Sequence, residues 1–335
     1  MPRALSKTAK HVWVLLTPKP MAEKVDISGR NIIVTGARPY SLGYETAKIL
    51  ASWGASVVAT SRHAAQAEKS LKDDLCKIGV NENNIAVRPL DLCDVDSVNG
   101  FATWYGENYG DKLHALVNNA GILKDVLQPW KKMPLTEDGF EIHWRINYLG
   151  SFHLTHLLLP LLKQTGLESG DARIVNVSSH LHDQGKNEDL FNDEKTYHSL
   201  SAYGRSKLAM IHFSREIERR FAQEYNLHSM AVHPGSVDTN MTRLEIPEGR
   251  IGDIWKRVGS ALAPLIMLHR THGAQTTVMC ASQSPLQGGQ YYVRCKAEEP
   301  TDACKDEAVS RRLWDKSEAW VETLKKPDGG EHEQI

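Results

Sequence analysis

The chain has 335 residues, of which 41% are hydrophobic and 24% are charged, and its net charge is −1. This composition indicates a globular protein, and the balanced charge argues against a nucleic-acid or anionic-membrane partner. Five scattered cysteines form no C-x-x-C pair, so no metal site or disulfide framework is predicted, and a reducing, cytoplasmic location is the simplest interpretation.

Residues 1–26 are predicted to be an N-terminal arm. The arm is basic, and its apolar run over residues 12–16 is too short for a signal sequence or a membrane span. Attachment to a membrane or targeting to an organelle through this arm is the minor alternative. The polar, glycine-rich residues 326–335 are predicted to be a mobile tail. Since no linker or repeat divides residues 27–325, they are predicted to form one domain.

Short β-branched runs alternate with amphipathic helical patterns along this domain. The predicted strands cover residues 31–37, 56–61, 84–91, 114–121, 172–179, 228–235 and 288–293. Regular alternation of strand and helix is typical of βαβ units. The predicted fold is therefore α/β, with a single Rossmann-type, doubly wound parallel sheet and helices on both faces.

The turn after the first predicted strand has the sequence TGARPYSLGYETA over residues 35–47. Such glycine-containing turns let backbone N–H groups approach a pyrophosphate at a helix N-terminus. The pattern departs from G-x-G-x-x-G, and Ser41 stands near the position of the middle glycine. Ser41 can donate its N–H and hydroxyl to phosphate, although its Cβ limits close approach. The candidate phosphate-binding residues are Gly36, Arg38, Ser41, Leu42 and Gly43, and an ordinary strand–helix turn is the alternative.

The end of the second predicted strand bears on the choice of dinucleotide. An acidic residue there would bind the ribose 2′-hydroxyl of NAD, but the sequence is Thr60-Ser61-Arg62. An arginine suits a 2′-phosphate because its planar fork pairs with phosphate oxygens, and Arg38 is a second such cation. NADP(H) is therefore preferred over NAD(H), and solvated surface arginines are the alternative.

Seven short strings occur together and in order. They are TGA…SLG, LDL (90–92), NNAG (118–121), INYLG (146–150), IVNVSS (174–179), YGRSK (203–207) and HPGSVDT (233–239). Over residues 28–320 the chain resembles the short-chain dehydrogenase/reductase family. The spacing from Ser179 to Tyr203 and the stretch GAQTTVMCASQSPLQGGQYYVRC resemble its retinol-dehydrogenase-like and WW-domain-oxidoreductase-like branch.

The resemblance implies a catalytic set. Tyr203 would be the general acid/base, and Ser179 would hydrogen-bond the substrate oxygen. Lys207, four residues after Tyr203 on one helix face, would hold the nicotinamide ribose, and its charge is expected to lower the pKa of the phenol. Asn147 would hold a water that relays protons from Lys207.

The same resemblance implies further cofactor contacts. Asp91 and Leu92 would bind the adenine. Around the adenosine, the pyrophosphate and the nicotinamide, the implied contacts are Asn118, Ala120, Gly121, Pro234, Gly235, Val237 and Thr239. For Asn118, a structural link between neighbouring strands is favoured over a contact with the cofactor.

Residues 241–270 are rich in apolar side chains, and in this family the region caps the substrate. An apolar or bulky substrate, such as a lipid aldehyde, retinoid, steroid or aromatic ketone, is therefore expected, and closure of the core is the alternative. His180, His182 and Asp183 are a conceivable metal cluster, but polar loop or substrate contacts are favoured. The family also implies a homodimer or tetramer.

The resulting hypothesis is an NADP(H)-dependent oxidoreductase acting on an alcohol/carbonyl pair. The alternative is a catalytically weak nucleotide-binding regulator on the same fold, because fold alone does not fix function. Reduction of C=C bonds, as in the divergent enoyl-reductase branch, is disfavoured because that branch has a wider Tyr-to-Lys spacing.

Overall fold

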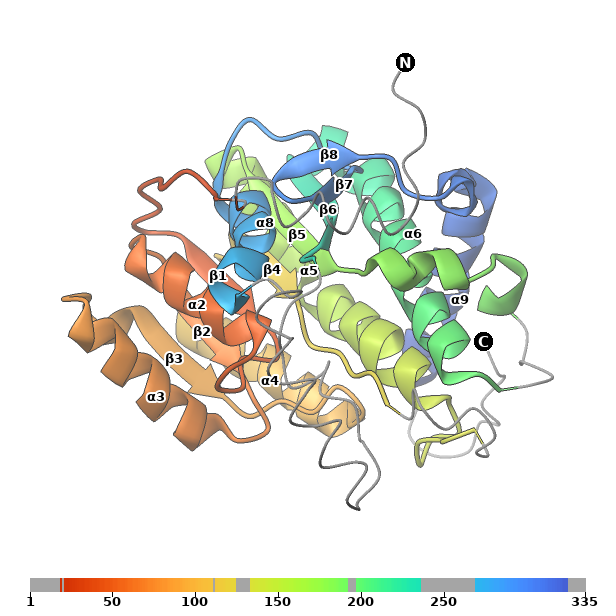
Figure 1. Cartoon of the computed structure of the whole chain (residues 1–335), viewed down its shortest axis with the longest axis horizontal. Helices are drawn as coiled ribbons and strands as arrows, with labels where there is room; N and C mark the ends of the chain where they lie inside the picture. Colours follow the sequence, from red (N-terminus) through yellow and green to blue (C-terminus); the bar gives the residue numbers. More distant parts are fainter. Residues whose placement is uncertain are drawn as a thin grey trace.

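The computed structural model describes residues 19, 21–110, 112–124, 133–191, 197–235 and 269–324. Its centre is an eight-stranded sheet with the order β3-β2-β1-β4-β5-β6-β7-β8 (Figure 1). The strands are β1 (Asn31–Val34), β2 (Ser56–Thr60), β3 (Ile85–Arg88), β4 (Ala115–Asn118), β5 (Ala172–Val177), β6 (Leu227–His233), β7 (Tyr291–Val293) and β8 (Lys296–Glu298). The predicted α/β class and parallel sheet are confirmed.

All neighbouring strands are parallel except β7 and β8, which form an antiparallel pair. The strand β7 lies within the predicted strand 288–293, but β8 and its antiparallel pairing were not predicted from the sequence. Its turn residues Arg294 and Cys295 have φ of 50° and 59°, so they form a tight hairpin without the usual Asn-Gly signal. The strand order reverses between β1 and β4, which is where an open α/β sheet forms its ligand crevice.

Helices cover both faces of the sheet (Figure 1). On one face lie α2 (Leu42–Ser52), α3 (Ala64–Lys77) and α8 (Arg270–Ser282), and on the other lie α4 (Val95–Tyr109), α5 (Gly150–Ser169), α6 (Ser199–Tyr225) and α9 (Glu307–Leu324). The alternation along β1 fits this arrangement, since Ile32 and Val34 join one core cluster and Ile33 the other. No helix in the described part of the chain is long and apolar enough to span a membrane.

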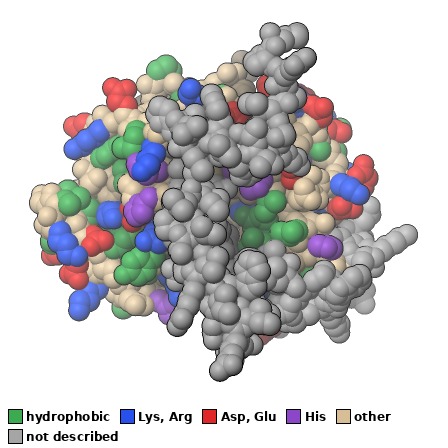
Figure 2. All heavy atoms as spheres, in the orientation of Figure 1, with side chains coloured by type: hydrophobic (Ala, Val, Ile, Leu, Met, Phe, Trp, Pro, Cys, Tyr) green, Lys and Arg blue, Asp and Glu red, His purple; other side chains and the backbone are tan. Residues whose placement is uncertain are grey.

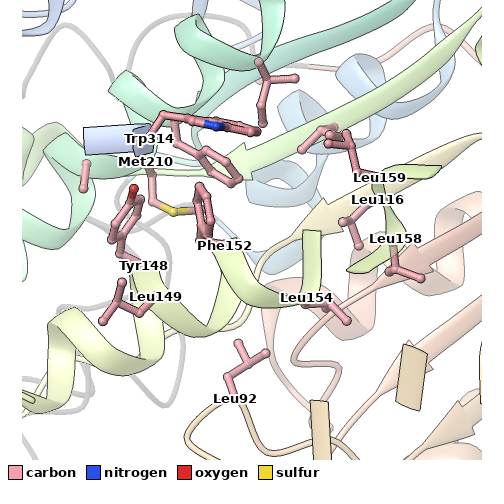
Figure 3. Packing of buried hydrophobic residues seen from close by; sticks show 14 of the residues in the cluster. Leu92, Leu116, Tyr148, Leu149, Phe152, Leu154, Leu158, Leu159, Met210 and Trp314 are labelled. Atoms are coloured by element: carbon pink, nitrogen blue, oxygen red, sulfur yellow. The ribbon is translucent and has the colours of Figure 1, made fainter. Parts of the chain in front are cut away.

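Aromatic packing holds α9 against α5 and α6. Figure 3 shows Trp314 of α9 beside Phe152 of α5, and their ring centroids are 5.2 Å apart. Trp314 also contacts Phe213 and Phe221 of α6, and it is almost fully buried. Burial of such rings is a large stabilising contribution. The packing therefore fixes the position of α6, the helix that carries Tyr203 and Lys207.

The residues just before 27 pack on the domain. The N–H of Ala22 donates to the Gln275 side chain of α8 at 2.9 Å, and Gln283 donates to the carbonyl of Glu23. Ala22 and Ile27 are both buried. The last part of the predicted arm thus lies against α8, whereas residues 1–18 and the predicted tail 326–335 lie outside the described residues.

Charged side chains of both signs are interspersed over the face drawn in Figure 2. This pattern agrees with the net charge of −1 and with 40 basic against 41 acidic residues. Large fields of a single sign are what attract polyanions such as nucleic acids. The described part of this face gives no support to such a partner.

Candidate active site

A cavity of about 650 Å³ opens at the carboxyl ends of the central strands. Most of the sequence-predicted cofactor residues line it. They are Gly36, Arg38, Ser41, Leu42, Arg62, Asp91, Leu92, Ala120, Gly121, Tyr203, Lys207, Pro234 and Gly235. Ser179 also lines the cavity, whereas Gly43, Asn118 and Asn147 are not among its lining residues.

Two glycines let the first turn pack closely against the segment after β4. Gly36 has φ of 76°, and a Cβ there would lie 2.8 Å from the Cα of Ala120. A Cβ on Gly43 would lie 2.4 Å from Nδ2 of Asn119 and 2.6 Å from the carbonyl oxygen of Gly36. Gly43 therefore allows the start of α2 to approach Asn119 and the backbone of Gly36. Gly36 adopts a left-handed backbone conformation and lines the cavity.

Ser41 is bound within the turn itself. Its N–H donates to the carbonyl of Arg38 at 3.0 Å, and its hydroxyl donates to the carbonyl of Gly36 at 3.1 Å. The same oxygen accepts the N–H of Tyr44 at 3.2 Å, so Ser41 is the N-cap of α2. Both donors that the sequence assigned to phosphate are thus already used, and the prediction needs correction on that point. The N–H groups of Leu42 and Gly43, in the first turn of α2, are the remaining candidates for a phosphate.

The two predicted 2′-phosphate ligands, Arg38 and Arg62, line the cavity and are exposed. Arg62 directly follows Ser61 at the end of β2, and no acidic residue stands there. Within the residues that the structure describes, neither guanidinium forms an ion pair at 4 Å or less. Both guanidinium groups are therefore available to an anionic group such as a phosphate. An acidic residue at the end of β2 would have repelled that group.

Ser179, Tyr203 and Lys207 converge on one wall of the cavity. Ser179 follows β5 by two residues, and its hydroxyl hydrogen-bonds the phenol of Tyr203. One turn further along α6, Nζ of Lys207 donates to the carbonyl of Val177 at 2.9 Å and lies 5.6 Å from the centroid of the Tyr203 ring. The Ser178 hydroxyl donates to the carbonyl of Lys207 at 2.8 Å, which ties α6 to the end of β5.

Burial changes the proton affinities of this pair. It raises the pKa of Tyr203 to about 12, although the hydrogen bond from Ser179 acts in the opposite direction. Burial also lowers the pKa of Lys207 to about 8. The net shift of the Tyr203 pKa is therefore upward, opposite to the lowering expected from Lys207, because desolvation of the phenol dominates. At neutral pH, Tyr203 is a neutral phenol and hence a proton donor.

Both polar atoms of the Asn147 side chain form hydrogen bonds with protein groups. It lies in η2 (Trp144–Leu149), a π-helical turn that leads into α5. Its Oδ1 accepts the N–H of Ile122 at 2.8 Å, and its Nδ2 donates to the carbonyl of Ile122 and to the hydroxyl of Ser206. The water predicted at Asn147 would therefore use the second lone pair of Oδ1 or the main-chain carbonyl, and π-helical turns often occur at functional sites.

Asn118 joins two strands instead of lining the cavity. Its Nδ2 donates to Oδ1 of Asn176 on β5 at 2.8 Å and to the hydroxyl of Thr155 at 3.0 Å. The predicted cofactor contact at Asn118 is corrected accordingly, and the next residue, Asn119, lines the cavity. Asn119 was missed because the string NNAG does not indicate which amide faces the sheet.

Several cavity residues were not predicted. They include Thr60, Ile122, Leu123, Lys124, Ile146, Leu181 and His233. Three of them, Ile122, Ile146 and His233, directly adjoin predicted positions, and the only sequence signal for the set was its place near the ends of strands. The predicted contacts Val237 and Thr239, and residues 241–268 of the predicted substrate cap, lie outside the described residues.

The histidines after β5 serve as polar loop contacts. His182 is buried, its Nδ1 contacts the carbonyl of Ser179 at 2.7 Å, and its Nε2 accepts the N–H of Thr301 at 3.2 Å. His180 packs edge-on against His233 with a centroid distance of 5.0 Å. No group of three or more metal-ligating side chains occurs in the ranges that the structure describes.

Comparison with known proteins agrees with this geometry. The family model for short chain dehydrogenases matches residues 30–248. Retinol dehydrogenase 14 of Homo sapiens is 38% identical over 314 residues, covering 89% of this chain and 88% of that protein. Retinol dehydrogenase 12 of Mus musculus is 36% identical over 298 residues, covering 88% and 86%. The active-site complex of RhlG from Pseudomonas aeruginosa with NADP has a TM-score of 0.60 and 22% identity, covering 80% of this chain and 95% of that one.

Proposed function

Since the chain belongs to the short-chain dehydrogenase family, we propose that it is an NADP(H)-dependent oxidoreductase that interconverts a carbonyl and an alcohol. The observation that carries the proposal is the convergence of Ser179, Tyr203 and Lys207 beside the glycine-containing turn. The relatives named retinol dehydrogenases support an apolar substrate, such as a retinoid or another lipid aldehyde. The apolar cavity residues Ile122, Leu123 and Leu181 are compatible with it.

The residues around the cavity fit a bound dinucleotide. A Cβ on Gly121 would lie 3.1 Å from Oδ1 of Asn147 and 3.3 Å from Nζ of Lys207, so a side chain there would crowd that ammonium. Leu42 and Gly43 would hold the pyrophosphate through their N–H groups, and Arg38 and Arg62 would pair with the 2′-phosphate. When bound, NADPH supplies the hydride.

The chain's own residues supply the proton. Ser179 donates a hydrogen bond to the substrate oxygen and keeps it near the phenol of Tyr203, which then transfers its proton to that oxygen. Because the pKa of Tyr203 is about 12, the phenol is in its acid form at neutral pH, the form that can protonate the oxygen of a carbonyl substrate. Lys207, protonated below its pKa of about 8, favours the phenolate left after transfer.

Substitution of Tyr203 by Phe tests the proposal. We expect reduction of all-trans-retinaldehyde with NADPH to fall by about 10²–10⁴-fold, because the general acid is lost, while NADPH still quenches tryptophan fluorescence. Tyr105→Phe is the matched control, since this buried phenol bonds the carbonyl of Lys112 and lies outside the cavity. Full turnover by Tyr203→Phe would contradict the role of Tyr203.

A nucleotide-binding regulator is the second candidate, and the observation that favours it is Ser41. Since its N–H and hydroxyl are used inside the turn, the pyrophosphate site has fewer donors than the sequence suggests. The two functions differ in one outcome. A wild-type chain that binds NADPH but reduces no retinoid, lipid aldehyde, steroid or aromatic ketone would favour the regulator.

A further inference from the structure

We propose that Glu141 and His143 are a positioning pair that holds the cavity segment 119–124 beside Lys207. Glu141 lies just before the π-helical turn that carries Asn147, His143 is the N-cap of this turn, and both side chains are buried. The hydrogen bonds of the pair can be tested without measuring activity. The effect of the pair on catalysis rests on the proposed function.

His143 connects a carboxylate with the backbone of the cavity segment. Its Nδ1 lies 2.7 Å from Oε1 of Glu141, and its Nε2 accepts the N–H of Lys124 at 3.0 Å. A carboxylate only accepts and a backbone N–H only donates, so a single neutral tautomer satisfies both contacts. That tautomer has its proton on Nδ1, and Glu141 therefore selects the form of His143 that can hold Lys124.

Glu141 is itself held from several elements. Its Oε2 accepts the N–H of Trp144 at 2.8 Å, and its Oε1 accepts the hydroxyl of Tyr197 at 3.3 Å. Arg205 of α6 places Nη2 3.9 Å from Oε2, which provides a compensating positive charge. A buried carboxylate needs such partners to remain ionised. Glu141 thus forms a fixed acceptor against which the His143 ring is oriented.

The segment after β4 is fastened at two points by residues four apart on the same helical turn. Asn147 binds both the N–H and the carbonyl of Ile122, and His143 binds the N–H of Lys124. Ser199, at the start of α6, donates its hydroxyl to the carbonyl of Lys124. Residues 119–124 all line the cavity. The pair therefore holds the Lys124 end of this wall, while Thr35 holds its other end through Asn119 and Ala120.

The wall matters because it stands against the proposed proton-transfer groups. Gly121 is within van der Waals reach of Lys207, since a Cβ there would lie 3.3 Å from Nζ. The ring of His143 also packs edge-on against that of Tyr203, with centroids 6.1 Å apart. A displaced wall would change the room beside Lys207, and small misplacements can reduce turnover by about 10²-fold.

Hydrogen exchange of the full chain tests the pair without relying on activity. In His143→Phe, which keeps a ring but loses both hydrogen bonds, we expect the Lys124 amide to exchange about tenfold faster. His143→Gln, whose side-chain carbonyl can accept the same N–H, should restore part of the protection. His212→Phe is the matched control, because His212 is a fully buried histidine bonded to Ser310 and Asn187 on the opposite side of α6.

Unchanged exchange at Lys124 in a folded His143→Phe, or equal acceleration in His212→Phe, would overturn the proposal. If His143→Phe does not fold, Glu141→Gln is the second variant. A glutamine has one acceptor oxygen, so it cannot accept both the Nδ1–H of His143 and the N–H of Trp144, and faster exchange is expected at Lys124 or at Trp144. Unchanged exchange at both amides in this variant would also overturn the proposal.

Kinetics then separate this proposal from the proposed function. With retinaldehyde and NADPH, His143→Phe should lower kcat much more than it raises KM, and His143→Gln should recover part of kcat. Faster exchange together with an inactive wild-type protein would refute the proposed function while supporting the positioning pair. Faster exchange with an unchanged kcat would refute the catalytic consequence of the pair.

Discussion

Substitution of Arg62 by Ala is the sharpest test of the preference for NADP(H). The guanidinium is exposed, lines the cavity and lies at the end of β2 where an NAD-selective site would carry an acidic residue. Hydrogen bonds to charged groups contribute about 1.5–3 kcal/mol. Because Arg62 is exposed to water, we expect the lower end, about 1.5 kcal/mol, which corresponds to about a tenfold weaker affinity for NADPH.

Titration of tryptophan fluorescence with NADPH and NADH measures the effect. NADH lacks the 2′-phosphate, so its affinity should stay within about twofold of the wild-type value, and added salt should weaken NADPH selectively. Arg38→Ala should act in the same direction. Arg311→Ala removes an exposed arginine of α9 outside the cavity and is the matched control. An equal loss of NADH and NADPH affinity in Arg62→Ala would refute the 2′-phosphate contact.

Two further predictions concern buried polar residues. Asn118→Ala should destabilise the fold by about 1–3 kcal/mol in denaturant unfolding, because Oδ1 of Asn176 loses its partner, while NADPH affinity changes less than about twofold. A large loss of affinity would restore Asn118 to the cofactor site. Burial lowers the pKa of His212 to about 4 in the folded protein. As the pH falls below about 6.5, His212 is therefore protonated in the unfolded chain while it stays neutral in the folded protein. His212 alone should account for a loss of about 2 kcal/mol in stability between pH 7 and 5, and a His212→Gln variant with the same pH dependence as the wild type would contradict this origin.

The fold was predictable because both faces of the sheet are covered. Strands such as Ser56–Thr60 and Ala172–Val177 carry short apolar, β-branched runs, and the alternation of such runs with helical patterns allows few other arrangements. The β7–β8 hairpin was not predictable in the same way. Its strands have three residues each, and its turn depends on φ angles at Arg294 and Cys295 that their side chains do not favour.

The cavity residues were predictable where a sequence motif lies at the end of a strand. They were less predictable where the local backbone conformation determines which groups a residue can bind. Ser41 stands at the expected place, but the extra residue in the turn lets its donors bind Arg38 and Gly36. The pKa of Tyr203 depends on how deeply α6 packs, which local sequence does not specify. His143 and Lys124 are 19 residues apart, and no spacing rule connects them.

One turn of α6 joins the parts of the candidate site. Tyr203 meets Ser179 at the end of β5, Ser206 meets Asn147 of the π-helical turn, and Lys207 meets the carbonyl of Val177. These partners lie on strand ends and helical turns, which hold a geometry more accurately than loops do. Because α9 fixes α6 through Trp314, a loss of that packing should disturb all three contacts together (Figure 3). The geometry of the proposed proton transfer therefore depends on the packing of α9 against α6.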